Sequence, residues 1–84
     1  MKTSESYDVW LITNSDETEY IYYDDSDWEF FFSPHITMAT TWETKEAAEL
    51  DIRLNIKPDL SDYYTGEYKV INVVIQYMKV YDAN

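Results

Sequence analysis

The chain has 84 residues, enough for one domain with a single core, and 45% of them are hydrophobic, which is more than disordered chains carry. Seventeen acidic residues against six basic ones give a net charge of -11, so the protein repels nucleic acid and anionic lipid and attracts basic surfaces. The absence of cysteine excludes disulfides and thiolate zinc sites and is typical of a reducing compartment.

We expect one domain over residues 1–84, located in the cytoplasm. No apolar stretch follows Lys2, so a secretory leader is not expected. The longest apolar runs are also far shorter than the ~20 residues that a membrane-crossing helix needs. The sequence therefore predicts no membrane partner.

A β-hairpin is predicted in the first third of the chain. Residues 1–6 are polar, and we expect them to fray. Residues 7–13 and 18–24 are rich in aromatic and β-branched side chains, which favour strands. Between them, residues 14–17 have the sequence Asn-Ser-Asp-Glu, whose short polar side chains favour a turn.

A second acidic turn and a third strand follow. Residues 24–27 repeat the turn signal, and residues 28–32 alternate, with Trp28 and two phenylalanines on one face. Pro34 ends this strand, because proline cannot donate to a strand ladder. Residues 36–41 either form a fourth strand or run irregularly.

A helix is predicted from an N-cap at Thr44 to Lys57, where Pro58 should stop it. The apolar stripe expected to face the core consists of Ala47, Leu50 and Leu54, with Ala48, Ile52 and Ile56 beside it. More than half of the helix circumference should then be buried. On the outer side, Glu49 and Arg53 have the spacing of a favourable ion pair.

The longest β signal covers residues 67–81, after a loop over residues 59–66 and before a short tail at residues 82–84. Both faces of this strand are partly apolar, which indicates a central strand or one whose far end meets another molecule. The elements together predict an α+β fold in the order β-β-(β)-α-β, a small antiparallel sheet with one helix packed on one face. The last strand is expected to pair with the first.

Residues for catalysis are scarce, and we expect no enzyme and no cofactor. His35 is the only histidine and lies at a strand end, with no cysteine or G-x-S-x-G serine to activate. A single glycine cannot supply a phosphate cradle. Seventeen acidic residues guarantee accidental carboxylate pairs, so such pairs have no specificity for acid-base chemistry.

A metal site is not expected either. Asp25, Asp27 and Glu29 have the alternate spacing of the first ligands in a calcium loop. The glycine position of that loop, however, holds Phe30, and the position of its bidentate acid holds Ile36.

Acidic and aromatic residues are interleaved in residues 14–32. Seven carboxylates lie between Asp16 and Glu29, and this segment contains no lysine or arginine. Because the aromatic neighbours favour burial, we expect the charges to be held rigidly on a surface. Such a surface can occupy a basic channel, with aromatic anchors among the acids; the alternative is acidity for solubility alone. The predicted partner-binding residues are Asp16, Glu17, Glu19, Tyr22, Asp24, Asp25, Asp27 and Glu29.

In size, lack of cysteine, negative charge and tyrosine content, the chain resembles phage-encoded inhibitors that mimic nucleic acid, among them anti-CRISPR, anti-restriction and uracil-DNA glycosylase inhibitor proteins. Residues 41–49, TWETKEAAE, also resemble the helix start of small phage proteins with a β-β-α-β layout. The resemblance implies a non-enzymatic monomer or homodimer in the host cytoplasm. Its partner would be a basic nucleic-acid-binding protein, such as a CRISPR-Cas effector, restriction enzyme or repair enzyme, rather than nucleic acid itself. The alternative is a small structural or assembly protein that uses the long last strand to oligomerise or to pair with a partner.

Overall fold

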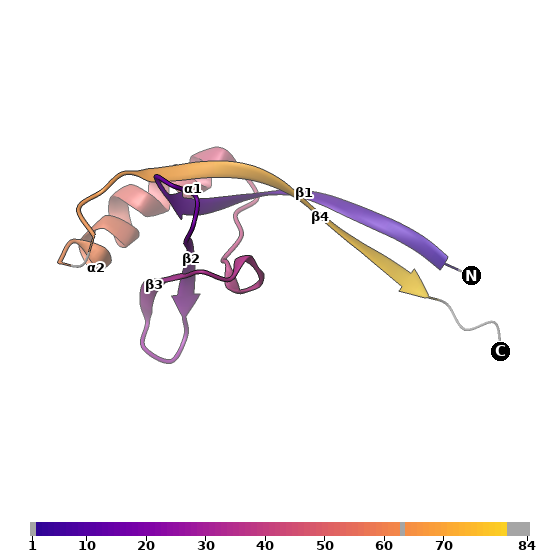
Figure 1. Ribbon diagram of the computed structural model, residues 1–84, viewed down its shortest axis with the longest axis horizontal. Helices are drawn as coiled ribbons and strands as arrows, with labels where there is room; N and C mark the ends of the chain where they lie inside the picture. The colour runs from indigo at the N-terminus through magenta and orange to yellow at the C-terminus, as the bar shows by residue number, and fades with distance from the viewer. Residues whose placement is uncertain (1, 63, 81–84) are drawn as a thin grey trace.

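Four strands form an antiparallel sheet, and one helical segment covers one of its faces (Figure 1). The computed structural model describes the backbone of residues 2–62 and 64–80 and the side chains of residues 6–62 and 64–75. The strand order is β3-β2-β1-β4. The predicted α+β class, with one helical layer on a small antiparallel sheet, is confirmed.

The first and last strands pair along their whole length. β1 (Lys2–Asn14) and β4 (Tyr68–Val80) are antiparallel, from Lys2 opposite Val80 to Asn14 opposite Tyr68. The predicted pairing of the last strand with the first is confirmed. The prediction that residues 1–6 fray is wrong for residues 2–6, because β4 is long enough to offer each of them a backbone partner.

The outer part of this strand pair extends away from the rest of the molecule as a two-stranded ribbon (Figure 1). The molecule therefore measures 55 × 25 × 21 Å along its principal axes. β4 is the last strand in the order, so it is an edge strand rather than a central one. The predicted strand residue Tyr81 and the predicted tail at residues 82–84 lie outside the described residues.

The second hairpin consists of β2 (Tyr20–Asp24) and β3 (Glu29–Ser33). Both predicted turns and the end of β3 before Pro34 are present, but the predicted pairing of residues 7–13 with residues 18–24 is limited to Thr13 opposite Tyr20. Trp28, however, does not belong to β3 as predicted; it lies in the turn with a φ angle of 59°. The four-residue connection between the strands ends on a left-handed residue, and Trp28 occupies that position.

The connection from β3 to the helix crosses the gap between β1 and the second hairpin. It begins with a 3-10 turn, η1 (Ile36–Met38). Residues 36–41 are therefore neither the predicted fourth strand nor a wholly irregular run. Its end then pairs with β1 at one position, where the backbone N–H groups of Trp10 and Trp42 each donate to the other's carbonyl, at 2.8 and 2.9 Å. Thr40 N–H also donates to the carbonyl of Ile21, at 3.0 Å. This segment therefore ties the hairpin to β1.

The helical segment begins at the predicted N-cap, where Thr44 Oγ1 accepts a hydrogen bond from Ala47 N–H at 3.1 Å. It comprises α1 (Lys45–Asp51), a π turn η2 (Ile52–Ile56) and α2 (Lys57–Leu60). The predicted stop at Pro58 is wrong. In an α-helix the proline ring would clash with the carbonyl four residues earlier, and the π turn moves that carbonyl away. Pro58 also lies in the first turn of α2, where its missing N–H is not needed.

The buried face of the helical segment is the row that was predicted to lie beside the main stripe, lengthened by one residue. Its members are Ala48, Ile52, Ile56 and Leu60, which repeat every four residues. An α-helix has 3.6 residues per turn and would let this row drift, whereas the wider π turn brings it back into line over the sheet. The predicted stripe of Ala47, Leu50 and Leu54 is exposed, with Leu54 at 58%. Glu49 pairs with Lys45 at 3.8 Å rather than with the predicted Arg53.

An aromatic group closes the end of the sheet near the first turn. The rings of Phe32 and Tyr68 stack with 6.1 Å between centroids, and Tyr64 meets both rings edge-on at 4.9 Å. The Tyr68 hydroxyl is buried and has no hydrogen-bond partner among the described residues. Burial, together with the nearby Tyr64, raises the pKa of Tyr68 above its usual value of 10.0.

Candidate partner-binding site

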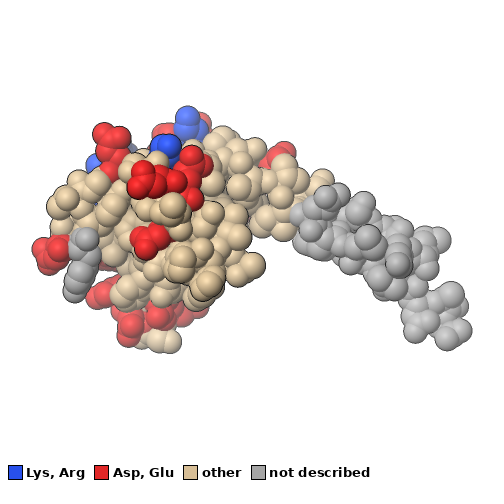
Figure 2. Space-filling view, viewed as in Figure 1, with Lys and Arg blue, Asp and Glu red and all other residues tan. Residues whose placement is uncertain are grey.

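The structure brings the predicted acidic residues together in two groups rather than one. Asp16, Glu17 and Glu19 lie in the first turn, residues 15–19, which joins β1 to β2. The other four, Asp24, Asp25, Asp27 and Glu29, lie in or beside the second turn, residues 25–28, which joins β2 to β3. These turns are at opposite ends of the five-residue strand β2, about 13 Å apart along the backbone. Figure 2 shows acidic atoms spread over the globular part of the molecule, from its upper edge, where lysine or arginine atoms lie among them, through its middle to the bottom.

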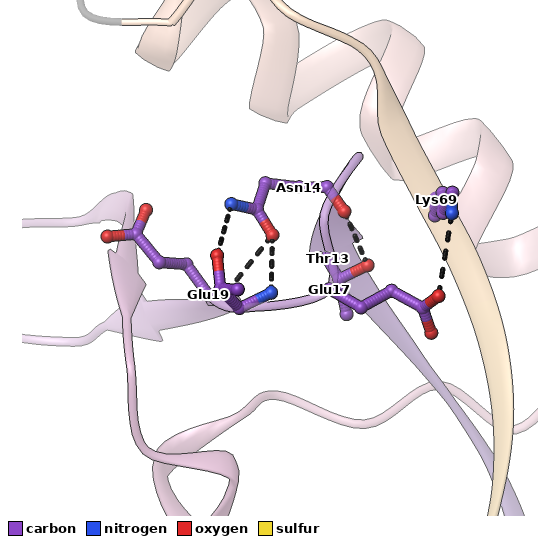
Figure 3. Close-up of polar contacts among 6 residues, drawn as sticks. Thr13, Asn14, Glu17, Glu19 and Lys69 are labelled. Carbon is purple, nitrogen blue, oxygen red and sulfur yellow. Dashed lines mark hydrogen bonds and ion pairs between the residues drawn. The ribbon is translucent and has the colours of Figure 1, made fainter.

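Side-chain hydrogen bonds hold the first turn together (Figure 3). Asn14 Oδ1 accepts from the backbone N–H groups of Thr18 and Glu19, at 2.9 and 3.1 Å. Asn14 Nδ2 donates to Thr18 Oγ1 at 2.9 Å, and the Asn14 carbonyl accepts from Glu17 N–H at 3.1 Å. Asparagine is a common turn residue because its short side chain can bond to the backbone in this way.

The charge of the first turn is partly offset by a lysine of β4. Lys69 Nζ lies 3.4 Å from Glu17 Oε2, and both side chains are about half exposed (Figure 3). An exposed pair of this kind contributes no more than about 1 kcal/mol to stability. It nevertheless places a positive charge beside the three acids, which makes the first turn the less attractive one to a basic partner.

The charge of the second turn is not offset. Asp24 lies directly opposite Glu29 in the strand register, and like charges in that position destabilise a hairpin. Neither of the two ion pairs among the described side chains involves this turn. Asp24 Oδ1 accepts from Ser26 N–H at 2.8 Å, which fixes one carboxylate in the turn. Four carboxylates are thus concentrated within six residues without a cation.

Trp28 stands at the end of the second turn with 77% of its surface exposed. Its left-handed backbone costs a residue with a side chain about 1–2 kcal/mol relative to a right-handed one. Its backbone N–H donates to the Asp24 carbonyl at 2.8 Å, which holds it there. Exposed tryptophan is among the residues that dominate binding interfaces. The second turn thus combines an exposed tryptophan, a left-handed backbone and a like-charge pair, none of which stabilises the fold.

The outer face of the hairpin, away from the helical segment, has its own aromatic pair. Tyr22 and Phe31 lie opposite each other in the register with 5.9 Å between ring centroids. Both are half-buried, and the Asp24 and Glu29 pair follows two residues along on the same face. Tyr22 was predicted to bind a partner; Phe31 was not, although the alternation of residues 28–32 places it on the face of Glu29.

On the inner side of the hairpin, a hollow of about 490 Å³ lies between the second turn and the helical segment. Aromatic side chains and two carboxylates of the helical segment line it together: Tyr23, Trp28, Phe30, Trp42, Asp51 and Asp59. Sequence reasoning missed Asp51 and Asp59, because they follow the turn by more than 20 residues and no local pattern links them to it. We call this hollow the aromatic-acidic pocket.

The described residues offer little for catalysis or metal binding. His35 is exposed and precedes η1, and its side chain caps nothing. No three histidine or acidic side chains gather closely enough to hold a metal ion in this part of the chain. None of the helices in the described ranges combines the length and the apolar character needed to cross a bilayer.

Comparisons with known proteins give no relative from which a function can be transferred. No family model, curated protein or solved structure matches the chain. The resemblance to phage-encoded inhibitors therefore stays one of composition. Charge, exposure and geometry at the second turn are the grounds for the proposal below.

Proposed function

We propose that the protein is a non-enzymatic inhibitor that binds the basic nucleic-acid site of a host defence or repair enzyme and replaces DNA or RNA there. The observation that carries this proposal is the second turn, in which four carboxylates without a cation surround an exposed tryptophan. The carboxylates supply the charge that a basic site ordinarily receives from phosphates. Trp28 supplies the contact area that slows dissociation.

The charge of the whole molecule supports binding to a basic surface. A net charge of -11 on 84 residues attracts such a surface over a Debye length and accelerates encounter, most strongly at low salt. The same charge repels nucleic acid itself. A partner whose own ligand is a polyanion fits both facts.

The second turn is carried on a fixed support. Tyr23 N–H donates to Thr40 Oγ1 at 2.8 Å, and Phe30 N–H donates to Asp59 Oδ2 at 3.3 Å. The first bond attaches β2 to the connection before the helical segment, and the second attaches β3 to α2. Charges that are already positioned lose less conformational freedom on binding, which favours affinity.

The test is a pull-down from host lysate at low and high salt, followed by competition between the protein and labelled nucleic acid for the captured enzyme. We expect capture at low salt that weakens steeply as salt rises. The triple variant Asp24→Asn, Asp25→Asn, Asp27→Asn should compete at least about tenfold more weakly.

A matched control changes the same number of charges on α1 and directly before its N-cap, by Glu43→Gln, Glu46→Gln and Glu49→Gln. It should compete almost as well as the natural protein. Equal competition by both triple variants and the natural protein would contradict nucleic-acid mimicry by the second turn.

A second candidate function is assembly through β4. This strand lies at the sheet edge. Val74 on one of its faces is 61% exposed, and Ile75 on the other face is partly exposed. An exposed apolar edge strand can pair with another chain. Light scattering at two protein concentrations tests this candidate: a dimer that persists in the triple variant of the second turn and dissociates in Val74→Lys favours assembly over inhibition.

A further inference from the structure

The aromatic-acidic pocket has a lining that selects for a cation. Its walls combine four aromatic rings with two carboxylates, and no lysine or arginine is among the lining residues that the structure describes. We propose that this pocket binds the guanidinium group of an arginine side chain. The inference rests on the proposed function only for the source of the arginine, which would be the basic partner.

The aromatic walls suit a planar cation. The rings of Tyr23 and Phe30 lie 5.0 Å apart between centroids at 55° to each other, which fixes one corner of the pocket. Trp42 is 8% exposed and forms the floor, whereas Trp28 stands largely free at the rim. A guanidinium group stacks on aromatic faces, and tryptophan provides the strongest cation–π attraction. Trp28 can therefore close over a bound side chain.

The two carboxylates are held in place and keep bonding capacity. Asp51 Oδ2 accepts from Trp42 Nε1 and Oδ1 from Asn55 Nδ2, each at 2.7 Å. Asp59 Oδ2 accepts from Phe30 N–H at 3.3 Å. Each carboxylate has about four acceptor positions, so both can still accept from a ligand. A single carboxylate can accept two parallel N–H donors from a guanidinium group, and the pocket offers two carboxylates.

The lining of the pocket disfavours anionic ligands and favours arginine over lysine on physical grounds. Two carboxylates and a net charge of -11 repel phosphate and carboxylate groups. A volume of about 490 Å³ holds a single side chain with its stem. A lysine ammonium is also a cation, but it is a compact point charge that does not stack and is more strongly hydrated. The lining therefore fits arginine better than lysine.

The direct test titrates the whole protein with Nα-acetylarginine amide and follows the indole N–H resonances of Trp28 and Trp42 by NMR. The neutral isostere Nα-acetylcitrulline amide and the lysine analogue Nα-acetyllysine amide serve as comparison probes. We expect saturable shifts with the arginine probe, weaker binding of the lysine probe and none of the citrulline probe. Binding of citrulline as tight as arginine, or of lysine as tight as arginine, would overturn the assignment.

Variants locate the binding. Trp28→Ala and Asp59→Asn should each weaken the arginine probe by at least about fivefold. Asparagine at position 59 can still accept from Phe30 N–H, so Asp59→Asn removes the charge without removing that bond. Glu46→Gln removes the same charge on the exposed surface of α1 and should change the affinity by less than about twofold. Equal weakening by Asp59→Asn and Glu46→Gln would show a general charge effect and overturn the site.

The probe assay separates this inference from the proposed function, because it contains no partner protein. If the arginine probe fails to bind while the natural protein still displaces nucleic acid, the pocket is wrong and the inhibitor proposal stands. If the probe binds while displacement fails, the arginine site stands and its source is a different basic protein.

Discussion

The first and second turns are similar in composition but opposite in construction. In the first, the Asn14 side chain accepts from the backbone N–H groups of Thr18 and Glu19, and Lys69 lies beside Glu17. In the second, Asp24 faces Glu29 across the strands, and Trp28 is exposed in a left-handed conformation. Each turn also contains one left-handed residue with a side chain, Glu17 with a φ angle of 57° and Trp28 with 59°, so the contrast lies in the like-charge pair and the exposed indole of the second turn.

This difference teaches that acidic composition alone does not identify a binding surface. Both turns contribute to the same run of carboxylates in the sequence. The two turns differ in the arrangement of their hydrogen bonds, neighbouring cations and exposed rings, which is visible in the fold and not in the composition. The comparison therefore supports proposing the second turn, rather than the first, as the recognition surface.

The largest expected effect is on partner binding by the second turn. Trp28→Ala should weaken binding to the captured enzyme by at least about 2 kcal/mol, or about 30-fold, because an exposed tryptophan at the centre of a charged turn has the features of an interface hot spot. Calorimetric titration measures the affinity. The matched variant Leu54→Ala removes another exposed apolar side chain and should leave affinity unchanged; equal losses would place the interface elsewhere.

Next in size is a stability effect confined to the first turn. Asn14→Ala should destabilise the protein by about 2 kcal/mol, because it removes the side chain that satisfies two backbone N–H groups. Asp24→Ala loses one such bond but also relieves the repulsion from Glu29, so its effect should be smaller, about 0.5 kcal/mol or less. Urea unfolding measures both. Equal destabilisation would remove the structural contrast between the turns.

A third prediction concerns Tyr68, which pairs with Asn14 at the base of the first turn. Tyr68→Phe should stabilise the protein by about 1–2 kcal/mol, because it removes a buried hydroxyl without a partner. Burial raises the pKa of Tyr68 in the folded state, so the natural protein keeps a proton there that the unfolded chain loses.

The pH dependence of stability follows from the direction in which the pKa of Tyr68 is shifted. The contribution of Tyr68 to stability is constant below pH 10 and falls as the pH rises through 10 toward the raised pKa of the folded state. Thermal unfolding between pH 8 and 11 should therefore show a smaller alkaline loss in Tyr68→Phe, with partner binding at neutral pH unaffected. Parallel curves for both proteins would contradict burial of this hydroxyl.

The smallest effect separates folding from function within the second turn itself. Trp28→Gly should raise stability by about 1 kcal/mol, since glycine adopts the left-handed conformation without strain. The same variant should bind the partner as weakly as Trp28→Ala. Thermal unfolding and the binding titration together check this; a less stable glycine variant would mean that the indole packs for stability.

Much of the fold follows from local patterns. The residues after β1 and β2 predict both turns, because short polar side chains bond to neighbouring backbone, although β1 and β2 then pair at one position only. Thr44 predicts the N-cap through its bond three residues ahead. The pairing of β4 with β1 was also predicted, whereas the strand formed by residues 2–6 was not, since their partners lie 70 or more residues away.

The helical face and the candidate site depended on information that local patterns do not contain. A wheel of 100° per residue assumes an α-helix, so it could not foresee the π turn that aligns Ala48 with Leu60 and admits Pro58. The alternation of residues 28–32 predicted that Trp28 belongs to a strand, whereas it lies in the turn before β3. The acidic and aromatic residues of the second turn were recognised from sequence, but Asp51 and Asp59 reach the same place only through the tertiary fold.

The central claim is that the second turn, and not the first, recognises the partner. The most direct measurement compares two triple variants of equal charge change against the captured enzyme at low salt: Asp24→Asn, Asp25→Asn, Asp27→Asn and Asp16→Asn, Glu17→Gln, Glu19→Gln. We predict that the first variant loses at least about tenfold in affinity and the second less than about threefold. Equal losses, or a larger loss from the variant of the first turn, would contradict the claim.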